Sequence, residues 1–137
     1  MILRMDHFTV VTDRLDDTVA FYGMLGLTVG PRPNFGVGGA WLYIGGHPVL
    51  HVVETTTMPE PRRGALDHMA FFAHDFQVVA AAIVRAGLPY RVIRTPRPFS
   101  QWQMFLQDPN GIDIELDFAP EETPPLDWKD HAGLTGR

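Results

Sequence analysis

The chain contains no cysteine, which excludes disulfides, thiolate nucleophiles and cysteine-based zinc sites. Any metal must therefore be held by nitrogen and oxygen, and a reducing cytoplasm is the expected location. The sequence has no apolar run of about 18 residues, and its start (MILRMDHF) lacks the layout of a signal peptide, so we expect no membrane segment. Positive charge is scarce as well: the net charge of −5 argues against a nucleic-acid partner.

The rest of the composition is that of an ordinary globular protein. The 137 residues are 45% apolar and 20% charged, which suffices for one hydrophobic core but is short for two independent domains. We expect a single domain over residues 1–120. A polar, partly ordered tail over residues 121–137 is expected to follow it.

The two halves of the chain repeat one pattern, with most matching positions 61 residues apart. The matching positions are Asp6-His7 and Asp67-His68, Gly26-Leu27 and Gly87-Leu88, and, after a small difference in loop length, His51 and Glu115. Such a repeat indicates one supersecondary unit that is duplicated, with its two copies packed against each other.

Each half is predicted to be a β-α-β-β-β module, so the fold class is α+β. In the first half, strands are expected at 4–11, about 27–30, 40–45 and 48–54, with a helix between an Asp13 N-cap and Gly26. In the second half, they are expected at 67–73, near 90–94, 102–106 and 112–118, with a helix between an Asp75 N-cap and Gly87. The modules cover about 3–55 and 64–118, and a linker spans 55–66.

Four potential metal ligands occupy equivalent strand positions in the two modules: His7, His51, His68 and Glu115. If the modules pack about a pseudo-two-fold axis, these four side chains converge on it. Imidazole and carboxylate together suit Fe, Mn, Ni, Co or Zn better than calcium or magnesium. Four ligands would leave two octahedral positions open for water or a bidentate substrate.

Each of these residues also has a plainer interpretation. A single histidine on a half-buried strand is more often a hydrogen-bonded core residue than a ligand. Glu115 and its neighbours Asp113 and Asp117 could form a charged edge that prevents aggregation. The joint occurrence at equivalent positions of the repeat favours the metal site, least firmly at His51.

With these residues in view, the chain resembles the vicinal oxygen chelate superfamily, which includes glyoxalases, fosfomycin-resistance proteins and extradiol dioxygenases. The resemblance covers about residues 3–118 and rests on three segments: MDHFTVVTDRLDDTVAFYGMLGLTV, ALDHMAFFAHD and FLQDPNGIDIEL. It implies two modules that form a cupped mixed sheet around a metal, with His7, His68 and Glu115 as ligands. It also implies a homodimer.

The resemblance leaves the subfamily open. Glyoxalase I enzymes carry a fourth ligand on the fourth strand, where this chain has His51; if His51 only supports the ligands, three remain, as in oxygen-activating iron enzymes. Extradiol dioxygenases and fosfomycin-modifying enzymes typically carry a tyrosine where this chain has Phe105, which counts against both. His47 could supply a dioxygenase-type histidine, or it could be a turn residue between Gly46 and Pro48.

The preferred prediction is a glyoxalase-like isomerase or lyase with one divalent metal ion, which chelates adjacent oxygens of a small substrate and stabilises an enediolate. Glu115 is the candidate base. The alternatives are a ring-cleaving dioxygenase with Fe(II) and a non-catalytic drug-binding protein of the bleomycin-resistance type. The candidate substrate contacts are Thr9, Trp41, Trp102, Phe105 and Arg94, the last from a cluster with Arg91 and Arg97. Each has a structural alternative, as strand former, core residue or solvated charge.

Overall fold

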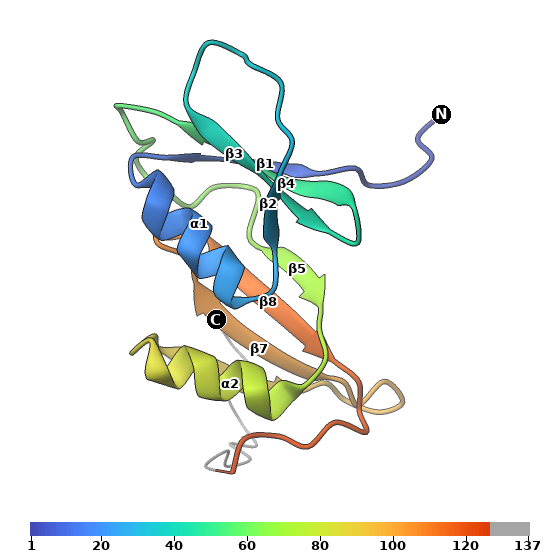
Figure 1. The fold of residues 1–137 in the computed structure, drawn as a ribbon. Coiled ribbons are helices and arrows are strands. Elements are labelled where there is room, and N and C mark those ends of the chain that lie inside the picture. Colours follow the sequence, from blue (N-terminus) through green and yellow to red (C-terminus); the bar gives the residue numbers. More distant parts are fainter. Residues whose placement is uncertain (127–137) are drawn as a thin grey trace. The chain divides into compact units, whose positions relative to one another are not determined.

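The structure is a computed structural model that describes residues 1–126 and has the predicted α+β fold of two β-α-β-β-β modules (Figure 1). The first module consists of β1 (Phe8–Thr12), α1 (Leu15–Met24), β2 (Thr28–Gly30), β3 (Gly39–Ile44) and β4 (His47–Glu54). The second consists of β5 (Met69–Phe72), α2 (Phe76–Arg85), β6 (Tyr90–Arg94), β7 (Trp102–Gln107) and β8 (Asp113–Phe118). No helix in the described range has the length and apolar character that crossing a membrane requires.

Each module forms its own four-stranded mixed sheet. The strand order is β1-β4-β3-β2 in the first module and β5-β8-β7-β6 in the second. In both, the first strand runs parallel to the last, and the remaining strands pair antiparallel. The two modules therefore share one topology, which confirms the duplication inferred from the repeat.

A helix covers one face of each sheet. In the first module α1 buries Phe21 and Tyr22, and it contacts β2, β3 and β4. In the second module the Phe76 ring of α2 stacks on Phe118 of β8, with ring centroids 4.2 Å apart. We call the opposite face of each sheet its open face. Because strand side chains alternate, Thr9 lies exposed on the open face while Val10 is buried under the helix.

Both helices end at the glycine that the sequence predicts. Gly26 and Gly87 have φ angles of 98° and 67°, a left-handed conformation that is easy only for glycine. After each glycine, the next backbone N–H donates to a carbonyl in the last turn: Leu27 to Tyr22 at 3.0 Å and Leu88 to Ile83 at 3.1 Å. The identical helix ends are part of the structural repeat.

The helix starts differ from the expectation. The N-cap of α1 is Arg14, not Asp13, and its side chain does not cap the helix. The Thr12 hydroxyl accepts the Arg14 N–H at 3.0 Å. Asp75 is the N-cap of α2, as predicted, but its own side chain does not cap the helix. Instead, the Glu122 carboxylate accepts the N–H groups of Asp75 and Phe76, at 3.1 and 3.0 Å.

The beginning of the predicted tail therefore contacts the second module. The Trp102 indole N–H donates to the Glu122 carbonyl at 3.1 Å, and the Gln77 amide donates to the Pro124 carbonyl at 3.3 Å. Residues 127–137 of the predicted tail lie outside the described residues.

The chain divides into two compact units that differ slightly from the two modules. The first unit comprises Met1–Ala65 together with Asp108–Gly111, and the second comprises Leu66–Gln107 together with the chain from Ile112. The turn between β7 and β8 thus belongs to the first unit. The predicted single domain over residues 1–120 stays a prediction.

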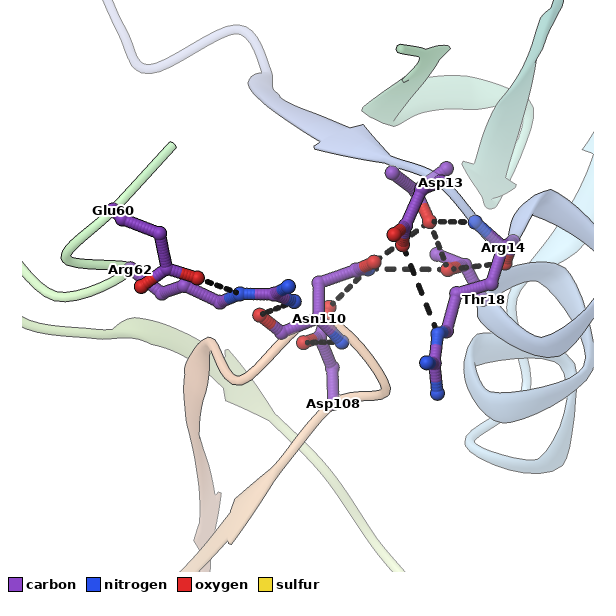
Figure 2. A network of polar contacts seen from close by, with 8 residues as sticks. Asp13, Arg14, Thr18, Glu60, Arg62, Asp108 and Asn110 are labelled. Atoms are coloured by element: carbon purple, nitrogen blue, oxygen red, sulfur yellow. Dashed lines mark hydrogen bonds and ion pairs between the residues drawn. The ribbon is translucent and has the colours of Figure 1, made fainter. Parts of the chain in front are cut away.

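That turn carries a buried polar network (Figure 2). The Gly111 N–H donates to the Asp108 carbonyl at 3.0 Å, which confirms the predicted turn. Asn110 is 1% exposed; its amide oxygen accepts the Thr12 hydroxyl at 2.6 Å, and its amide nitrogen donates to Thr18 Oγ1 at 3.1 Å. Because each of these buried groups has a partner, the network fixes the turn against β1 and α1.

Candidate metal and substrate site

His7 and His51 form the first candidate ligand pair, on the open face of the first sheet. His7 directly precedes β1, which is shorter than the predicted strand, and the following Thr9 is aligned with His51 in the parallel register. The two imidazole rings stack with their centroids 3.7 Å apart and their planes 17° apart. The first module thus brings together two of the four predicted ligands.

His68 and Glu115 form the second candidate pair, on the second module. His68 directly precedes β5, and its Nε2 lies 3.0 Å from Oε2 of Glu115, which is 7% exposed. Two ligand atoms that are each roughly 2.1 Å from a metal and at right angles to one another lie about 3.0 Å apart. The spacing of this pair therefore suits neighbouring positions of an octahedral metal.

An aspartate orients the first histidine of each module. Asp6 Oδ2 lies 2.7 Å from His7 Nδ1, and Asp67 Oδ2 lies 2.7 Å from His68 Nδ1. The bond to His7 is the main reason why the pKa of Asp6 is lowered. A carboxylate on Nδ1 is the usual support of a metal-binding histidine, because it presents Nε2 to the ion. The repeated Asp-His pair thus has the geometry of a ligand and its support.

His51 is prepared to act as a neutral ligand. Its ring lies between His7 and Trp41, with the Trp41 ring 4.0 Å away and nearly parallel. Burial, and then the nearby His7, lower its pKa, so the imidazole keeps the lone pair that a metal requires. Its Nε2 is buried without a hydrogen-bond partner. A metal ion would accept the lone pair of this nitrogen, so the unpaired Nε2 of His51 is consistent with a metal ligand.

Gln103, which sequence reasoning missed, holds the Glu115 carboxylate. Its amide nitrogen donates to Glu115 Oε1 at 2.5 Å and to Asp117 Oδ1 at 3.0 Å. Burial, and then the Asp117 charge, raise the pKa of Glu115, while His68 opposes the rise. A carboxylate with a raised pKa exchanges protons closer to neutral pH. Strand alternation could have identified Gln103, because it places Gln103 on the same face as Phe105, and Gln103 pairs with Asp117 in the β7–β8 register.

Three of the predicted substrate contacts lie on the open faces. They are Thr9, Trp41 and Phe105. Trp41 of β3 pairs with His51 on the neighbouring strand β4, and Phe105 of β7 pairs with Glu115 on β8. Each module thus places an aromatic ring beside the candidate ligand of its fourth strand. The Phe105 ring also meets His68 edge to face, with centroids 6.4 Å apart.

Trp102 and Arg94 lie on the helix-covered face of the second sheet. Trp102 is 3% exposed and packs against Phe76, with ring centroids 6.0 Å apart. The Arg94 guanidinium lies over the Trp102 ring and donates from Nε to the Ser100 carbonyl at 3.1 Å. Both residues thus have packing roles, and their predicted contact with substrate stays a prediction that this placement does not favour.

His47 is the first residue of β4, so its interpretation as a turn residue is wrong. The turn between β3 and β4 needs only Gly45 and Gly46, and the strand therefore begins earlier than 48. His47 Nε2 lies 3.0 Å from the Asp6 carbonyl oxygen. In this position it holds the segment that carries His7.

Within each module two candidate ligands meet. Over residues 1–126, no group of three or more histidine, aspartate or glutamate side chains is placed to hold a metal ion. The donor chemistry of the two pairs, three imidazoles and one carboxylate, nevertheless suits a borderline divalent ion.

The family model of the Glyoxalase/Bleomycin resistance protein/Dioxygenase superfamily matches residues 4–116. The chain belongs to this superfamily. Members of the superfamily include enzymes and resistance proteins. Among curated proteins, no sequence matches the chain.

Solved structures share the superfamily fold. A glyoxylase/bleomycin resistance protein/dioxygenase domain from Frankia sp. EAN1pec has a TM-score of 0.70 at 20% identity, over 90% of this chain and 96% of that one. A glyoxalase family protein from Enterococcus faecalis has 0.64 at 23%, over 83% and 96%. The fosfomycin resistance protein FosX from Listeria monocytogenes has 0.66 at 19%, over 85% and 91%. At these identities the likeness shows the fold alone.

Proposed function

We propose that the chain is a divalent-metal-dependent enzyme with glyoxalase-like isomerase or lyase chemistry. Its metal ion is held by two ligand pairs, His7 with His51 and His68 with Glu115, either in one chain or across a homodimer. The observation that carries the proposal is the duplicated pair itself: each module sets two ligand-type side chains together on its open face, and an aspartate orients the first of them. A purely structural repeat does not need polar residues at these positions.

A bound metal supplies Lewis-acid polarisation of two neighbouring substrate oxygens, which makes the adjacent C–H acidic. Glu115 is the base that takes this proton and returns it. Gln103 holds Oε1, so the proton would move at Oε2, the oxygen that faces His68, when Oε2 does not bind the metal. In the chain without metal, burial raises the pKa of Glu115, which is the direction that a general base requires.

The aromatic rings beside the ligands exclude water from the reacting oxygens. Trp41 covers one face of His51, and Phe105 stands against His68 and opposite Glu115. Apolar walls of this kind lower the local dielectric and strengthen the electrostatic stabilisation of an anionic intermediate.

A homodimer and a cytoplasmic location belong to the same proposal. The absence of cysteine supports the location. Apolar side chains that are well exposed in the isolated chain, such as Val29 and Phe72, support association with a second copy.

Metal analysis of purified protein tests the site. The wild-type chain is expected to bind one divalent ion per site, and His68→Ala is expected to lose it while its circular dichroism spectrum is unchanged. His74→Ala is the matched control, because His74 also pairs with a neighbouring aspartate (Nδ1 to Asp75 Oδ2, 2.8 Å) but is exposed on another part of the module. Equal metal content in the two variants contradicts the proposal.

Two further measurements separate the remaining alternatives. Oxygen uptake with a catechol and bound iron would assign the chain to the ring-cleaving dioxygenases. Absence of metal in the wild-type protein, with tight binding of an aromatic drug, would assign it to the non-catalytic resistance proteins. Mixed dimers of His7→Ala and His68→Ala chains regain one metal site of two if the site is shared between copies, and none if it lies in one chain.

A further inference from the structure

Arg32 follows β2 and joins the aromatic cluster on the open face of the first sheet. Its guanidinium carbon lies 5.2 Å from the centre of the Phe35 ring, which is in turn 6.0 Å from the Trp41 ring. Trp41 stacks on His51. Arg32 is therefore part of the surroundings of the first ligand pair.

Arg32 has a buried donor without an acceptor. One of its terminal nitrogens, Nη2, donates to the Val37 carbonyl at 3.1 Å, while its Nε is buried and has no hydrogen-bond partner. Within residues 1–126, the only other buried side-chain nitrogen or oxygen in this condition is Nε2 of His51. Buried polar groups are almost always paired, so two unpaired atoms in the same cluster point to a ligand that completes both.

The chemistry of the two atoms defines that ligand. A guanidinium N–H calls for an anionic oxygen and pairs best with a planar carboxylate. Nε2 of a neutral imidazole calls for a metal or a proton donor. A carboxylate supplies the oxygen that Arg32 lacks, and an oxygen on the neighbouring carbon would bind a metal held at His51.

We propose that Arg32 binds the carboxylate of the substrate, and that the substrate is an α-hydroxy or α-oxo acid with an apolar or aromatic side group. The assignment of the neighbouring oxygens to the metal rests on the function proposed above, whereas the carboxylate contact with Arg32 does not need the metal. The Phe35 and Trp41 rings are the surface for the apolar group.

Other arginines of the first unit are already engaged. Arg4 pairs with Asp6, Arg14 with Asp13, and Arg62 with Glu60 and the Asn110 carbonyl. Arg32 has no carboxylate partner in the described part of the chain. Its positive charge is thus available to an anion from outside, which distinguishes it from Arg94, the arginine that the sequence suggested.

The Phe35 ring lies under the guanidinium, and the Val37 carbonyl accepts one of its N–H groups. The two side chains are 58% and 51% exposed, although both belong to the segment that contacts Arg32. Exposed large apolar side chains next to an unpaired hydrogen-bond donor are typical of a ligand-binding surface. A carboxylate with an attached ring would bury them.

Binding of benzoate to the metal-free full-length chain tests the contact, with benzamide as the neutral probe of the same shape. Isothermal titration is expected to show benzoate binding that Arg32→Gln weakens by about tenfold or more, the usual effect of a charge-assisted hydrogen bond. Arg32→Lys, which keeps the charge but lacks the Nε donor, is expected to bind with intermediate affinity. Arg14→Gln is the control, because Arg14 is exposed at the start of α1, and it is expected to bind benzoate as the wild type does.

The outcomes separate this inference from the proposed function. Equal benzoate affinities of the wild type and Arg32→Gln, or equal affinities for benzoate and benzamide, overturn the inference. If the wild-type protein binds no metal but Arg32→Gln still weakens benzoate binding, the anion contact is supported and the metal proposal is contradicted. In metal-loaded protein, mandelate is expected to bind more tightly than benzoate, because its hydroxyl adds the second donor; equal binding there overturns the assignment of an α-oxygenated acid.

Discussion

Replacement of Asn110 by alanine is expected to destabilise the protein strongly, because its amide is the centre of the buried network in Figure 2. The amide makes three side-chain hydrogen bonds: it accepts from Thr12 at 2.6 Å, and it donates to Thr18 Oγ1 and to Asp108 Oδ2, both at 3.1 Å. Asn110→Ala removes all three at once.

The magnitude follows from the partners that stay behind. The Thr12 hydroxyl can turn to Thr18 Oγ1, 3.0 Å away, and Asp108 Oδ2 still accepts the Tyr22 hydroxyl at 3.0 Å. No partner is left entirely unpaired, so the cost is the net value of three hydrogen bonds, about 3 kcal/mol in the free energy of unfolding. For a chain of this length we expect a fall of roughly 10 °C in Tm.

Urea and thermal unfolding followed by circular dichroism measure this loss. Asn34→Ala is the matched control, because Asn34 is exposed and accepts a single hydrogen bond, from the Gly36 N–H at 2.9 Å; it is expected to cost less than about 0.5 kcal/mol. A double-mutant cycle with Thr12→Val is expected to give a coupling energy of about 1 kcal/mol. If Asn110→Ala costs no more than Asn34→Ala, the network does not hold the turn and the reasoning is refuted.

Four further predictions concern the second module. In Glu115→Gln the metal content is expected to fall while the metal-free protein is as stable as the wild type or more so, because a buried charge beside Asp117 is removed; metal analysis and thermal unfolding check this. The fold raises the pKa of Glu115 above 4.5, so the contribution of Glu115 to the stability of the metal-free protein decreases as pH rises through the raised pKa. Metal affinity is expected to increase over the same pH range, because the carboxylate must be ionised to bind the ion. Metal titrations at several pH values measure this increase. Gln103→Leu is expected to move the midpoint of that affinity profile to higher pH, because the carboxylate loses a donor; an unchanged profile contradicts the role of Gln103. Glu122→Ala is expected to cost about 1 kcal/mol in thermal unfolding, because two N–H groups at the start of α2 lose their acceptor.

The duplicated fold could be predicted because several of its features depend on short stretches of sequence. Gly26 and Gly87 end their helices through backbone conformations that a side chain strains, and the Asp108–Gly111 turn forms from its own residues. Such features depend on neighbours in sequence, so the sequence contains them directly.

The surroundings of the site were harder to predict because they depend on which face of each sheet the helix covers. Trp102 and Phe105 are three residues apart in one strand, so alternation alone places them on opposite faces. Only the packing of Phe76 on Trp102 shows which of the two is buried. Arg32 was missed for another reason: it lies outside any strand, and its unpaired Nε is a property of the folded segment.

The repeat is symmetric at the Asp-His pairs and asymmetric at His51 and Glu115, and the surroundings of these two residues differ in the same sense. Burial and the nearby His7 lower the pKa of His51, and the Trp41 ring stacks on its imidazole. Burial and the neighbouring Asp117 carboxylate raise the pKa of Glu115, while the Gln103 amide fixes one of its oxygens. The two copies of the module thus differ in their surroundings at the same position. If the four residues serve one metal, the first module is suited to bind an anionic substrate and the second to move its proton, and neither module is sufficient alone.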